Sequence, residues 1–491
     1  MLTTILSILI ILLVLLLFLA AVLIFRAVMF GRVPGPVEAV EAAPVDSLLV
    51  TEHLAEVIRV QTVSLGENEP VNGAAFEQLH RALEGMYPRL HAALQRERVN
   101  QFSLLYTWPG RSKELEPVLL CGHMDVVPHD PIAGEWQHPP FDGAVADGFV
   151  WGRGALDMKS TIVSILEAVE SLVRAGYQPE RTLYLAFGHD EEIGGTQGAS
   201  VMAKLLAERG VRLAAVLDEG AAVMESLLPG VSVPVALIGI AEKGYASFEL
   251  RVEGRAGHSS MPPKHTAIGV LARAIARVEA HPMPPRMAMA RLMFEDLGAY
   301  LPFAMRLALA NSWLFGKTVQ NRFDASPETG ALIRTTQAVT MIQGGIKDNI
   351  LPAQAAAVVN CRILPGETCE TVREHIRRAI DDEAVQIRLD ENMGWEPSPV
   401  SPVNSEIYQG LSLCIRQVFP DAAVAPYLVA GATDSRYYTA ISENVFRFSP
   451  YEMNAELLKT IHGVDERIAT ERLAKMVGFY MHLIQSWTSE A

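Results

Sequence analysis

Histidine and acidic side chains gather at five places where an apolar run of the sequence ends. The first place holds His123 and Asp125, directly after the apolar run 118–121. The period of two along a strand sends both side chains to the same face. A carboxylate beside an imidazole is the arrangement that orients a metal-ligating histidine. Alone, such an H-x-D pair is more often structural or solvated, so its meaning depends on the other four places.

Three further places repeat this arrangement. Asp157 lies in the glycine-rich turn 152–159 before an expected helix, where an N-cap is the simpler role. Three consecutive acids, 190–192, follow an apolar run, and adjacent carboxylates repel one another unless cations neutralise them. The acidic pair 218–219 ends the next apolar run. Each of these sites is weak evidence alone, but their repetition at apolar ends favours one shared centre.

The fifth place is His462, which precedes an expected closing helix over 464–487, with Asp465 and Glu466 as ordinary acids of its first turn. The five places together supply two imidazoles and three carboxylates: His123, Asp157, Glu192, Asp218 and His462. Zn²⁺ binds such nitrogen and oxygen ligands, and a bridging carboxylate holds two ions about 3.5–4 Å apart. The sequence therefore predicts a two-metal site.

Short strands alternating with helices must bring these residues together. The expected strands and helices alternate along the chain as 118–121, 162–173, 182–187, 201–209 and 213–217. This order is typical of a layered α/β sheet, which keeps its sites at the carboxyl ends of the strands. Asp147-Gly148 between apolar flanks predicts a hairpin within this layer.

The pattern changes near residue 241, where an inserted module begins. Strands around 248–252, 338–342 and 355–363 with helices over 266–278 and 371–382 predict two α+β layers. Residues 281–328 are rich in Met, Leu and Ala and are expected to be mostly helical. The expected parts are an N-terminal anchor (1–30), a tether (31–45), the sheet domain (46–240 and 396–491) and the inserted module (241–395).

Composition excludes some classes of partner. The 491 residues include 41 Lys and Arg against 56 Asp and Glu, for a net charge of −15. No basic cluster interrupts this acidic balance, so we expect no nucleic-acid partner. The four cysteines form no C-x-x-C pair and are expected to be free thiols. Cys361 and Cys369 could form a disulfide if the protein is exported.

Residues 5–25 form an uninterrupted apolar stretch whose one polar side chain is Ser7. At 1.5 Å per residue such a helix covers about 30 Å, the thickness of the hydrocarbon core. A cleaved signal has a shorter apolar region behind a basic start, so the stretch predicts a single-pass anchor in membrane lipid. Arg26 and Arg32 after it favour a cytoplasmic body.

The motifs together resemble the M20 metallopeptidases, and within them the carboxypeptidase S branch, which includes Gly-X carboxypeptidase and the N-acyl-amino-acid synthase/hydrolases. The resemblance covers residue 46 to the C terminus. It rests on GHMDVVP (122–128), GRGALDMKS (152–160), GHDEEIGG (188–195), LDEG (217–220), IHGVDE (461–466), GRAGHSS (254–260), DNILP (348–352) and GATDSRYY (431–438). It implies a zinc-peptidase-like catalytic sheet domain and an inserted lid or dimerisation domain, with a possible homodimer through the latter.

The resemblance also implies two zinc ions, replaceable by Co²⁺ or Mn²⁺. By this resemblance, His123 and Asp218 would bind one ion, Glu192 and His462 would bind the other, and Asp157 would bridge them. Eukaryotic relatives of this branch work in lumenal or secreted compartments, so the side of the membrane on which the body lies stays open.

Five further residues receive roles in the same way. Glu191 would be the general base for a metal-bridging water, and Asp125 would orient His123. His258 of the inserted domain would stabilise the oxyanion, often across a dimer. Arg436 is the candidate for binding the substrate α-carboxylate, because a guanidinium matches a carboxylate with two hydrogen bonds. Asn349 could add a hydrogen bond to the substrate, whereas a surface salt bridge is the simpler role of Arg436.

The expected function is a dinuclear zinc amide hydrolase that releases an amino acid with a free carboxylate. Its substrates would be small peptides or N-acyl amino acids, as for a carboxypeptidase or an N-acyl-amino-acid hydrolase. One alternative is a membrane-anchored binding protein that keeps the fold without catalysis, but none of the five ligands is missing. The other is a single-metal aminoacylase or dipeptidase.

Overall fold

The computed structural model describes residues 2–31, 35–40, 45–66, 69–130, 132, 134–226 and 230–489, without the side chains of 390–393. The chain packs as two units. Unit 1 contains Met1–Val33, Ala241–Val400 and Leu428–Ala432. Unit 2 contains Pro34–Ile240, Ser401–Tyr427 and Thr433–Ala491. The predicted roles of unit 2 as catalytic domain and of unit 1 as lid or dimerisation domain stay predictions. The predicted tether lies partly outside the described residues, and Arg32 lies outside them.

Unit 2 is built on a mixed sheet whose centre is parallel. Strand β3 (Val118–His123) pairs in parallel with β6 (Leu183–Gly188) on one side and with β7 (Ala215–Asp218) on the other. The strand order is β1-β2-β6-β3-β7-β17-β9-β8-β18, and β16 pairs with β9. The other strands are β1 (Gln95–Val99), β2 (Ser103–Trp108), β8 (Val223–Met224), β9 (Val235–Glu242), β16 (Ala423–Val429), β17 (Val445–Arg447) and β18 (Glu452–Met453). The carboxyl ends of β6, β3 and β7 therefore share one edge.

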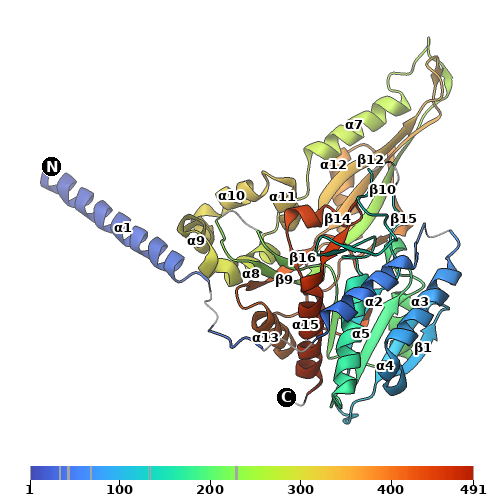
Figure 1. The fold of residues 1–491 in the computed structure, drawn as a ribbon. Helices are drawn as coiled ribbons and strands as arrows, with labels where there is room; N and C mark the ends of the chain where they lie inside the picture. The colour runs from blue at the N-terminus through green and yellow to red at the C-terminus, as the bar shows by residue number, and fades with distance from the viewer. Residues whose placement is uncertain are drawn as a thin grey trace. The chain divides into compact units, whose positions relative to one another are not determined.

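Helices cover both faces of this sheet. Met202 of α6 packs in one cluster with Leu119 and Cys121, whereas Ile162 of α5 lies beside Gly122, which points the other way. On the α5 side, α2 and α15 pack against α5 (Figure 1). The helices of unit 2 are α2 (Ser47–Arg59), α3 (Gly73–Met86), α4 (Pro88–Ala93), α5 (Lys159–Arg174), α6 (Ala199–Glu208), α13 (Glu406–Val418), α14 (Ala455–Leu458) and α15 (Thr470–Thr488). The predicted layering is confirmed.

A small antiparallel sheet confirms the predicted hairpin and corrects the predicted closing helix. Strands β4 (Ala144–Ala146) and β5 (Phe149–Trp151) flank Asp147 and Gly148, whose φ values are 53° and 79°. Two central residues with positive φ are what a two-residue hairpin turn requires. Strand β19 (Arg467–Ala469) pairs with β5, so the last helix begins at Thr470 and not near 464.

Unit 1 contains an antiparallel sheet in the order β12-β14-β10-β15, with α7 and α12 packed against one face (Figure 1). Phe248, Leu250 and Val252 of β10 point into this core at every second position. The elements are β10 (Gly244–Glu253), β12 (Thr336–Gly344), β14 (Gln354–Ile363), β15 (Val385–Trp395), α7 (Ala267–Ala280) and α12 (Cys369–Ile380). All four cysteines of the protein are free and buried, as predicted.

The remaining part of unit 1 is helical. Residues 281–328 were expected to be mostly helical, and the structure forms α8 (Ala288–Leu297), α9 (Phe303–Ala310), α10 (Ser312–Phe323) and α11 (Pro327–Ile333) there. Helix α1 (Leu2–Val28) packs against α9. Within the described residues, α1 is the one helix long and apolar enough to cross a membrane, a test that a signal sequence also passes.

Candidate metal centre

The sheet of unit 2 gathers the predicted residues at one edge. His123 is the last residue of β3, Asp218 is the last residue of β7, and the acids 190–192 follow β6 after one intervening residue. Because these three strands are parallel neighbours, their ends lie side by side. Asp157 precedes α5, and His462 lies in the loop before β19. The apolar runs that form these strands thus bring histidine and acidic side chains from distant segments to one edge of the sheet.

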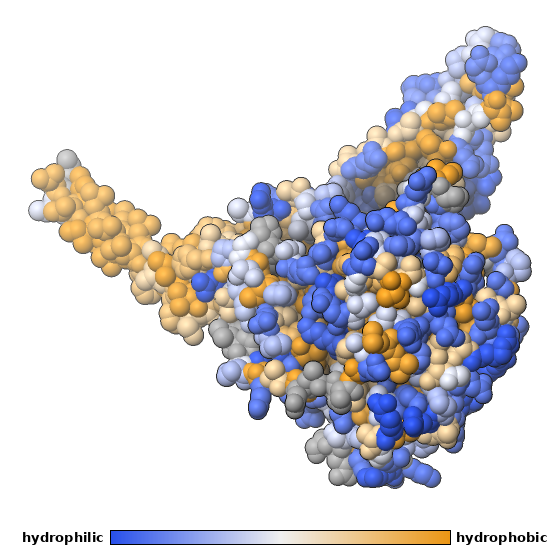
Figure 2. Space-filling model, viewed as in Figure 1, coloured by the Kyte–Doolittle hydropathy of each residue, from blue (hydrophilic) through white to orange (hydrophobic). Residues whose placement is uncertain are grey.

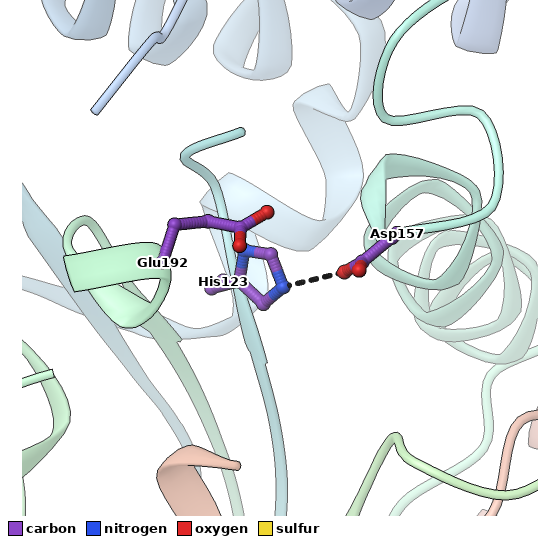
Figure 3. Close-up of side chains that lie close together, drawn as sticks. All are labelled: His123, Asp157 and Glu192. Atoms are coloured by element: carbon purple, nitrogen blue, oxygen red, sulfur yellow. Dashed lines mark hydrogen bonds and ion pairs between the residues drawn. The ribbon is translucent and has the colours of Figure 1, made fainter. Parts of the chain in front are cut away.

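His123 presents one ring nitrogen to this site. Its Nδ1 lies 2.9 Å from the backbone carbonyl of Asp125, which can accept a hydrogen bond from a protonated Nδ1. In the neutral ring this leaves Nε2 with a free lone pair. Nε2 lies 3.0 Å from Oδ1 of Asp157, as Figure 3 shows together with Glu192. The imidazole is fully buried, so its orientation is fixed for binding a cation.

Asp157 lies between two imidazoles. Its Oδ1 faces His123, and its Oδ2 lies 3.0 Å from Nε2 of His462. Glu192 approaches the same nitrogen of His462 with Oε2 at 3.3 Å. The N-cap position of α5 belongs to Met158, which makes no capping bond, so Asp157 is not a helix cap. A carboxylate that places one oxygen beside each of two histidines has the geometry to bridge two metal ions.

Asp218, a predicted ligand, and its neighbour Glu219 make different contacts. The Asp218 carboxylate accepts hydrogen bonds from the backbone N–H of Ser435 at 2.7 Å and of Glu219 at 2.9 Å. Glu219 itself brings Oε1 to 3.1 Å from Nε2 of His123. The prediction named Asp218 and did not include Glu219, which the same strand end also carries. We call His123, Asp157, Glu192, Glu219 and His462 the two-histidine cluster.

Asp125 contacts more than His123. Its Oδ1 is 3.4 Å from Nδ1 of His123, farther than its own backbone carbonyl. The two carboxylate oxygens also accept the backbone N–H groups of Glu191 at 3.1 Å and Glu192 at 3.2 Å, and Oδ2 accepts the Ser64 hydroxyl at 2.7 Å. Asp125 therefore fixes the turn that carries both glutamates as well as facing the imidazole.

Glu466 supports Asp157 from behind and was missed as a functional residue. It is fully buried, and its Oε1 accepts the backbone N–H groups of Leu156 at 2.8 Å and Asp157 at 3.1 Å. Its Oε2 pairs with Arg153 at 2.6 Å. The interpretation of Glu466 as an ordinary acid of a first helical turn is wrong, because the residue precedes β19 and lies inside the protein. A helix-start pattern and a buried ion pair look alike in sequence.

The turn after β6 also involves residues of the GATDSRYY motif. The buried carboxylate of Asp434 lies against Gly195, where an added Cβ would meet Oδ1 at 2.1 Å and where φ is 68°. Arg436, half-buried, donates to the carbonyl of Gly194 and stacks over the ring of Tyr437 at 4.7 Å. Arg436 therefore contacts the turn that carries Glu191, and its predicted role in binding a substrate carboxylate stays a prediction.

The clustered charges shift one another's pKa values in the metal-free protein. Burial raises the pKa of Glu191 well above its usual range, and burial followed by the Asp157 charge raises the pKa of Glu219 to about 8. Hydrogen bonds to Asp157 and Glu192 raise the pKa of His462 to about 10. Burial opposes ionisation of Asp157, yet the hydrogen bonds from both imidazoles hold its pKa below the usual value.

This arrangement fits divalent cations. Two sets of side chains have ligand atoms within 4.8 Å of one another, and both include His123: one adds Asp157 and Glu192, the other Glu191 and Glu219. Oε1 of Glu192 is buried without a hydrogen-bond partner. Buried carboxylates that repel one another and retain free lone pairs are stabilised when a cation neutralises them. The nitrogen and oxygen donors match the preference of zinc.

The remaining predicted residues, His258 and Asn349, belong to unit 1. They lie on neighbouring segments, because β11 (Gly257–His258) pairs with β13 (Ile350–Leu351) and the N–H of Ser259 donates to the Asn349 carbonyl at 3.2 Å. We call β11, β13 and Asn349 the His258 ribbon. Nδ1 of His258 accepts the N–H of Ser260 at 3.1 Å, so a neutral ring carries its proton on Nε2, where it can be donated.

A large hollow lies elsewhere, on the sheet of unit 1. It has a volume of about 730 Å³ and is lined by residues such as Tyr245, Met341 and Arg362. Among the described residues, the histidine and carboxylate groups close enough to hold a metal ion lie in unit 2. We therefore assign the chemistry to the two-histidine cluster and not to this hollow.

Comparison with known proteins finds relatives that match most of the chain. Residues 119–486 match the family model described as "Peptidase family M20/M25/M40". The probable carboxypeptidase S-like 2 of Dictyostelium discoideum is 37% identical over 441 residues, covering 89% of this chain and 85% of that protein. The N-fatty-acyl-amino acid synthase/hydrolase PM20D1 of Xenopus tropicalis is 38% identical over 451 residues, covering 91% and 87%.

Solved structures show the same fold. The M20 family metallo-carboxypeptidase Sso-CP2 from Sulfolobus solfataricus superposes with a TM-score of 0.64 at 17% identity, covering 90% of this chain and 99% of that one. Human carnosine dipeptidase 1 superposes with a TM-score of 0.60 at 14% identity, covering 90% and 96%. At such identities the similarity establishes the α/β fold.

Proposed function

The chain belongs to peptidase family M20/M25/M40, and we propose that within this family of hydrolases it is a dinuclear zinc amide hydrolase that releases an amino acid with a free carboxylate. One observation carries the proposal. Asp157 places one carboxylate oxygen 3.0 Å from His123 and the other 3.0 Å from His462, inside a cluster of partly buried acids. Two separate imidazoles joined by one carboxylate form a cradle for two cations.

The proposed ligands form two sets around Asp157. His123 with Glu219 would hold one ion, and His462 with Glu192 would hold the other. The contact of 3.1 Å between Glu219 and His123 supports this choice of Glu219 over the predicted Asp218. Asp218 would then support the site without binding an ion, by accepting hydrogen bonds from two backbone N–H groups.

The proposed chemistry needs a base, and Glu191 is suited to that role. Two zinc ions, when bound, would polarise the scissile carbonyl and lower the pKa of a water from 15.7 to about 7. Glu191 would accept the proton of the attacking water and deliver it to the leaving nitrogen. Burial raises its pKa, which supports this role because a carboxylate of raised pKa accepts a proton more readily than an ordinary one.

The substrates we propose are small peptides or N-acyl amino acids. The relatives named as carboxypeptidases and N-fatty-acyl-amino acid synthase/hydrolases support both classes. Arg436 would meet the α-carboxylate of the released amino acid, since its guanidinium already lies beside the Glu191 turn through Gly194. His258 would stabilise the oxyanion through its Nε2 proton, and Asn349 would bind the substrate from the same ribbon.

We further propose that α1 is a retained anchor. A cleaved signal leaves no contacts in the folded protein, whereas Arg26 donates to the carbonyl of Ala310 at 3.0 Å and Asn311 donates to that of Leu23 at 3.0 Å. These bonds tie the end of α1 into unit 1. A homodimer through the inserted module stays part of the proposal and can be tested by mass photometry in detergent.

The test is an assay of the purified full-length protein in detergent. Matched Gly-X dipeptides and long-chain N-acyl amino acids are incubated with it, before and after chelation, and released amino acid is measured. We expect turnover of at least one class, loss on chelation and recovery with zinc. Turnover that survives complete metal removal would refute the metal mechanism.

Metal counting separates the dinuclear from the single-metal alternative. Zinc per chain, measured by inductively coupled plasma mass spectrometry, should be two in the active protein and should fall in Asp157→Ala. Full activity with one zinc per chain would refute the bridging role of Asp157. Two zinc ions without turnover of any amide would favour the binding-protein alternative.

A further inference from the structure

The end of α1 is built into the helical part of unit 1. Besides the bonds of Arg26 to Ala310 and of Asn311 to Leu23, Ala27 is fully buried. Gly31 approaches the turn after α8 so closely that an added Cβ would meet the backbone nitrogen of Ala299 at 2.4 Å. This part of unit 1 therefore has a fixed position relative to the end of the anchor.

Helix α9, which packs against α1, and α10, which packs against α9, expose apolar side chains. Helix α10 is described along its whole length and none of its residues is buried. Trp313 is 61% exposed, and Phe303 and Leu314 are also exposed. Figure 2 shows the apolar surface of α1 continuing onto the adjoining helical part of unit 1. A soluble protein rarely leaves a tryptophan and its apolar neighbours exposed together without a partner.

The anchor sets the depth of these helices. The apolar run 5–25 fills a hydrocarbon core of about 30 Å, so Leu23 and Arg26 lie at its edge. Ala310 and Asn311 are hydrogen-bonded to those two residues and must lie at the same depth. Trp313 follows two residues later, and tryptophan is enriched at the level of the lipid headgroups.

Charge points to the same partner. From Phe303 to Phe323 the sequence contains Arg306, Lys317 and Arg322 and no acidic residue. This contrasts with the net charge of −15 of the whole chain. A helix pair that combines exposed apolar side chains with basic ones is suited to an interface of acyl chains and phosphate headgroups.

We propose that α9 and α10 form a second membrane contact, seated in the headgroup layer of the phospholipid bilayer that α1 crosses. The proposal rests on the anchoring by α1 and not on the hydrolase chemistry. Trp313 and Leu314 enter the boundary between headgroups and acyl chains, and Lys317 and Arg322 face the phosphates. Two contacts hold unit 1 at a fixed depth, where one helix alone would let it swivel.

The test places a fluorescent label at three depths in the full-length protein in nanodiscs of mixed zwitterionic and anionic phospholipid. Bimane is attached to Trp313→Cys, to Leu13→Cys in the middle of α1, and to Ile346→Cys, which is 92% exposed elsewhere in unit 1. The unsubstituted protein, whose four cysteines are buried, gives the labelling background. Lipids brominated on the acyl chain and aqueous iodide serve as quenchers.

We expect brominated lipid to quench the labels at 13 and 313, and iodide to quench the label at 313 several-fold less than the label at 346. A label at 313 that behaves like the one at 346, while the label at 13 is quenched by lipid, would overturn the headgroup contact and leave the anchor intact. Absence of lipid quenching at 13 would overturn both. Shielding of 313 from both quenchers would assign the surface to a second copy of the chain and overturn the proposal. Leu314→Cys repeats the measurement should Trp313→Cys fail to fold.

Discussion

The two-histidine cluster in unit 2 and the His258 ribbon in unit 1 carry the predicted chemistry in opposite ways. In the cluster, His123 is fully buried and the side chains of its acidic neighbours are 5–18% exposed, whereas that of His462 is 51% exposed. Asp125 and Glu466 accept the backbone N–H groups of residues 191, 192 and 157. In the ribbon, His258 is exposed on a strand of two residues and is held by the N–H of Ser260. The cluster is therefore assembled before substrate arrives, whereas the ribbon offers a single donor.

This difference predicts which properties of the protein a substitution in each region should change. A change in the cluster should alter metal binding, proton transfer or folding, because its charges depend on one another in a buried site. A change in the ribbon should alter turnover without altering metal content or stability. Variants in the two regions test whether effects on metal binding and stability are separate from effects on turnover.

The largest effect is expected for Glu191→Gln. The amide cannot accept the proton of the attacking water, so kcat should fall by about 10²- to 10⁴-fold. Zinc per chain should stay unchanged, because glutamine keeps the backbone N–H that Asp125 accepts. Glu208→Gln, an exposed acid on α6, is the matched control and should keep full activity. Full turnover by Glu191→Gln would disprove its role as base.

Glu466→Gln should cost the most stability. It leaves the buried Arg153 without its charged partner, and breaking such a pair costs about 3–5 kcal/mol of unfolding free energy. Glu456→Gln removes the exposed partner of Arg467 and should cost about 0–1 kcal/mol. Urea denaturation of both variants, compared with the parent protein, measures the difference. Equal midpoints would mean that the support behind Asp157 contributes nothing.

His258→Ala tests the ribbon. Loss of an oxyanion donor should lower kcat by about 10²- to 10³-fold, with zinc content and unfolding midpoint unchanged. His265→Ala removes another exposed histidine of unit 1 and should leave kcat unaltered. If His258→Ala loses zinc or stability instead, the separation between the ribbon and the cluster fails.

Much of the cluster could be predicted because local sequence patterns determine it. An apolar run followed by His or acid marks a strand end, and parallel strands bring such ends together, which indicated His123 and Glu192. Asp157 was predicted from a glycine-rich turn before a helix, and His462 from its place before the closing helix. Glu466 could not be found in this way, because its partner Arg153 is more than 300 residues away in sequence. No pattern of burial or period marks such a long-range ion pair.

The same limit applies to the fold. The strands β3, β6 and β7 followed from their apolar runs, and the hairpin followed from Asp147-Gly148. The start of the last helix did not, because pairing of β19 with β5 overrides the helical periodicity that begins near residue 464. The docking of α1 was likewise hidden, since an apolar span looks the same whether or not its end packs against a partner.

Proton release on zinc binding tests the charges of the cluster. In the metal-free protein, the raised pKa values of Glu219, about 8, and His462, about 10, mean that both carry a proton below pH 8. Despite the burial of His123, the carboxylates around it raise its pKa as well, so a cation must displace its proton in addition to these two. Affinity should therefore rise steeply with pH, by at least about 100-fold per pH unit below pH 8. Isothermal titration in buffers of different ionisation enthalpy counts the protons. Heats that do not depend on the buffer would contradict the prediction.

The smallest effect distinguishes Asp218 from Glu219. An asparagine side chain has one acceptor oxygen where aspartate has two, so Asp218→Asn should keep only one of the two backbone N–H bonds. Zinc affinity should then weaken by about 10- to 100-fold, as expected for a residue that supports ligands without binding the ion. Glu219→Gln should weaken affinity further and reduce proton release by one, because it removes a charged ligand beside His123. Competition with a chromogenic chelator measures both constants. A larger loss for Asp218→Asn would return Asp218 to the ligand set and leave Glu219 as a neighbour of His123.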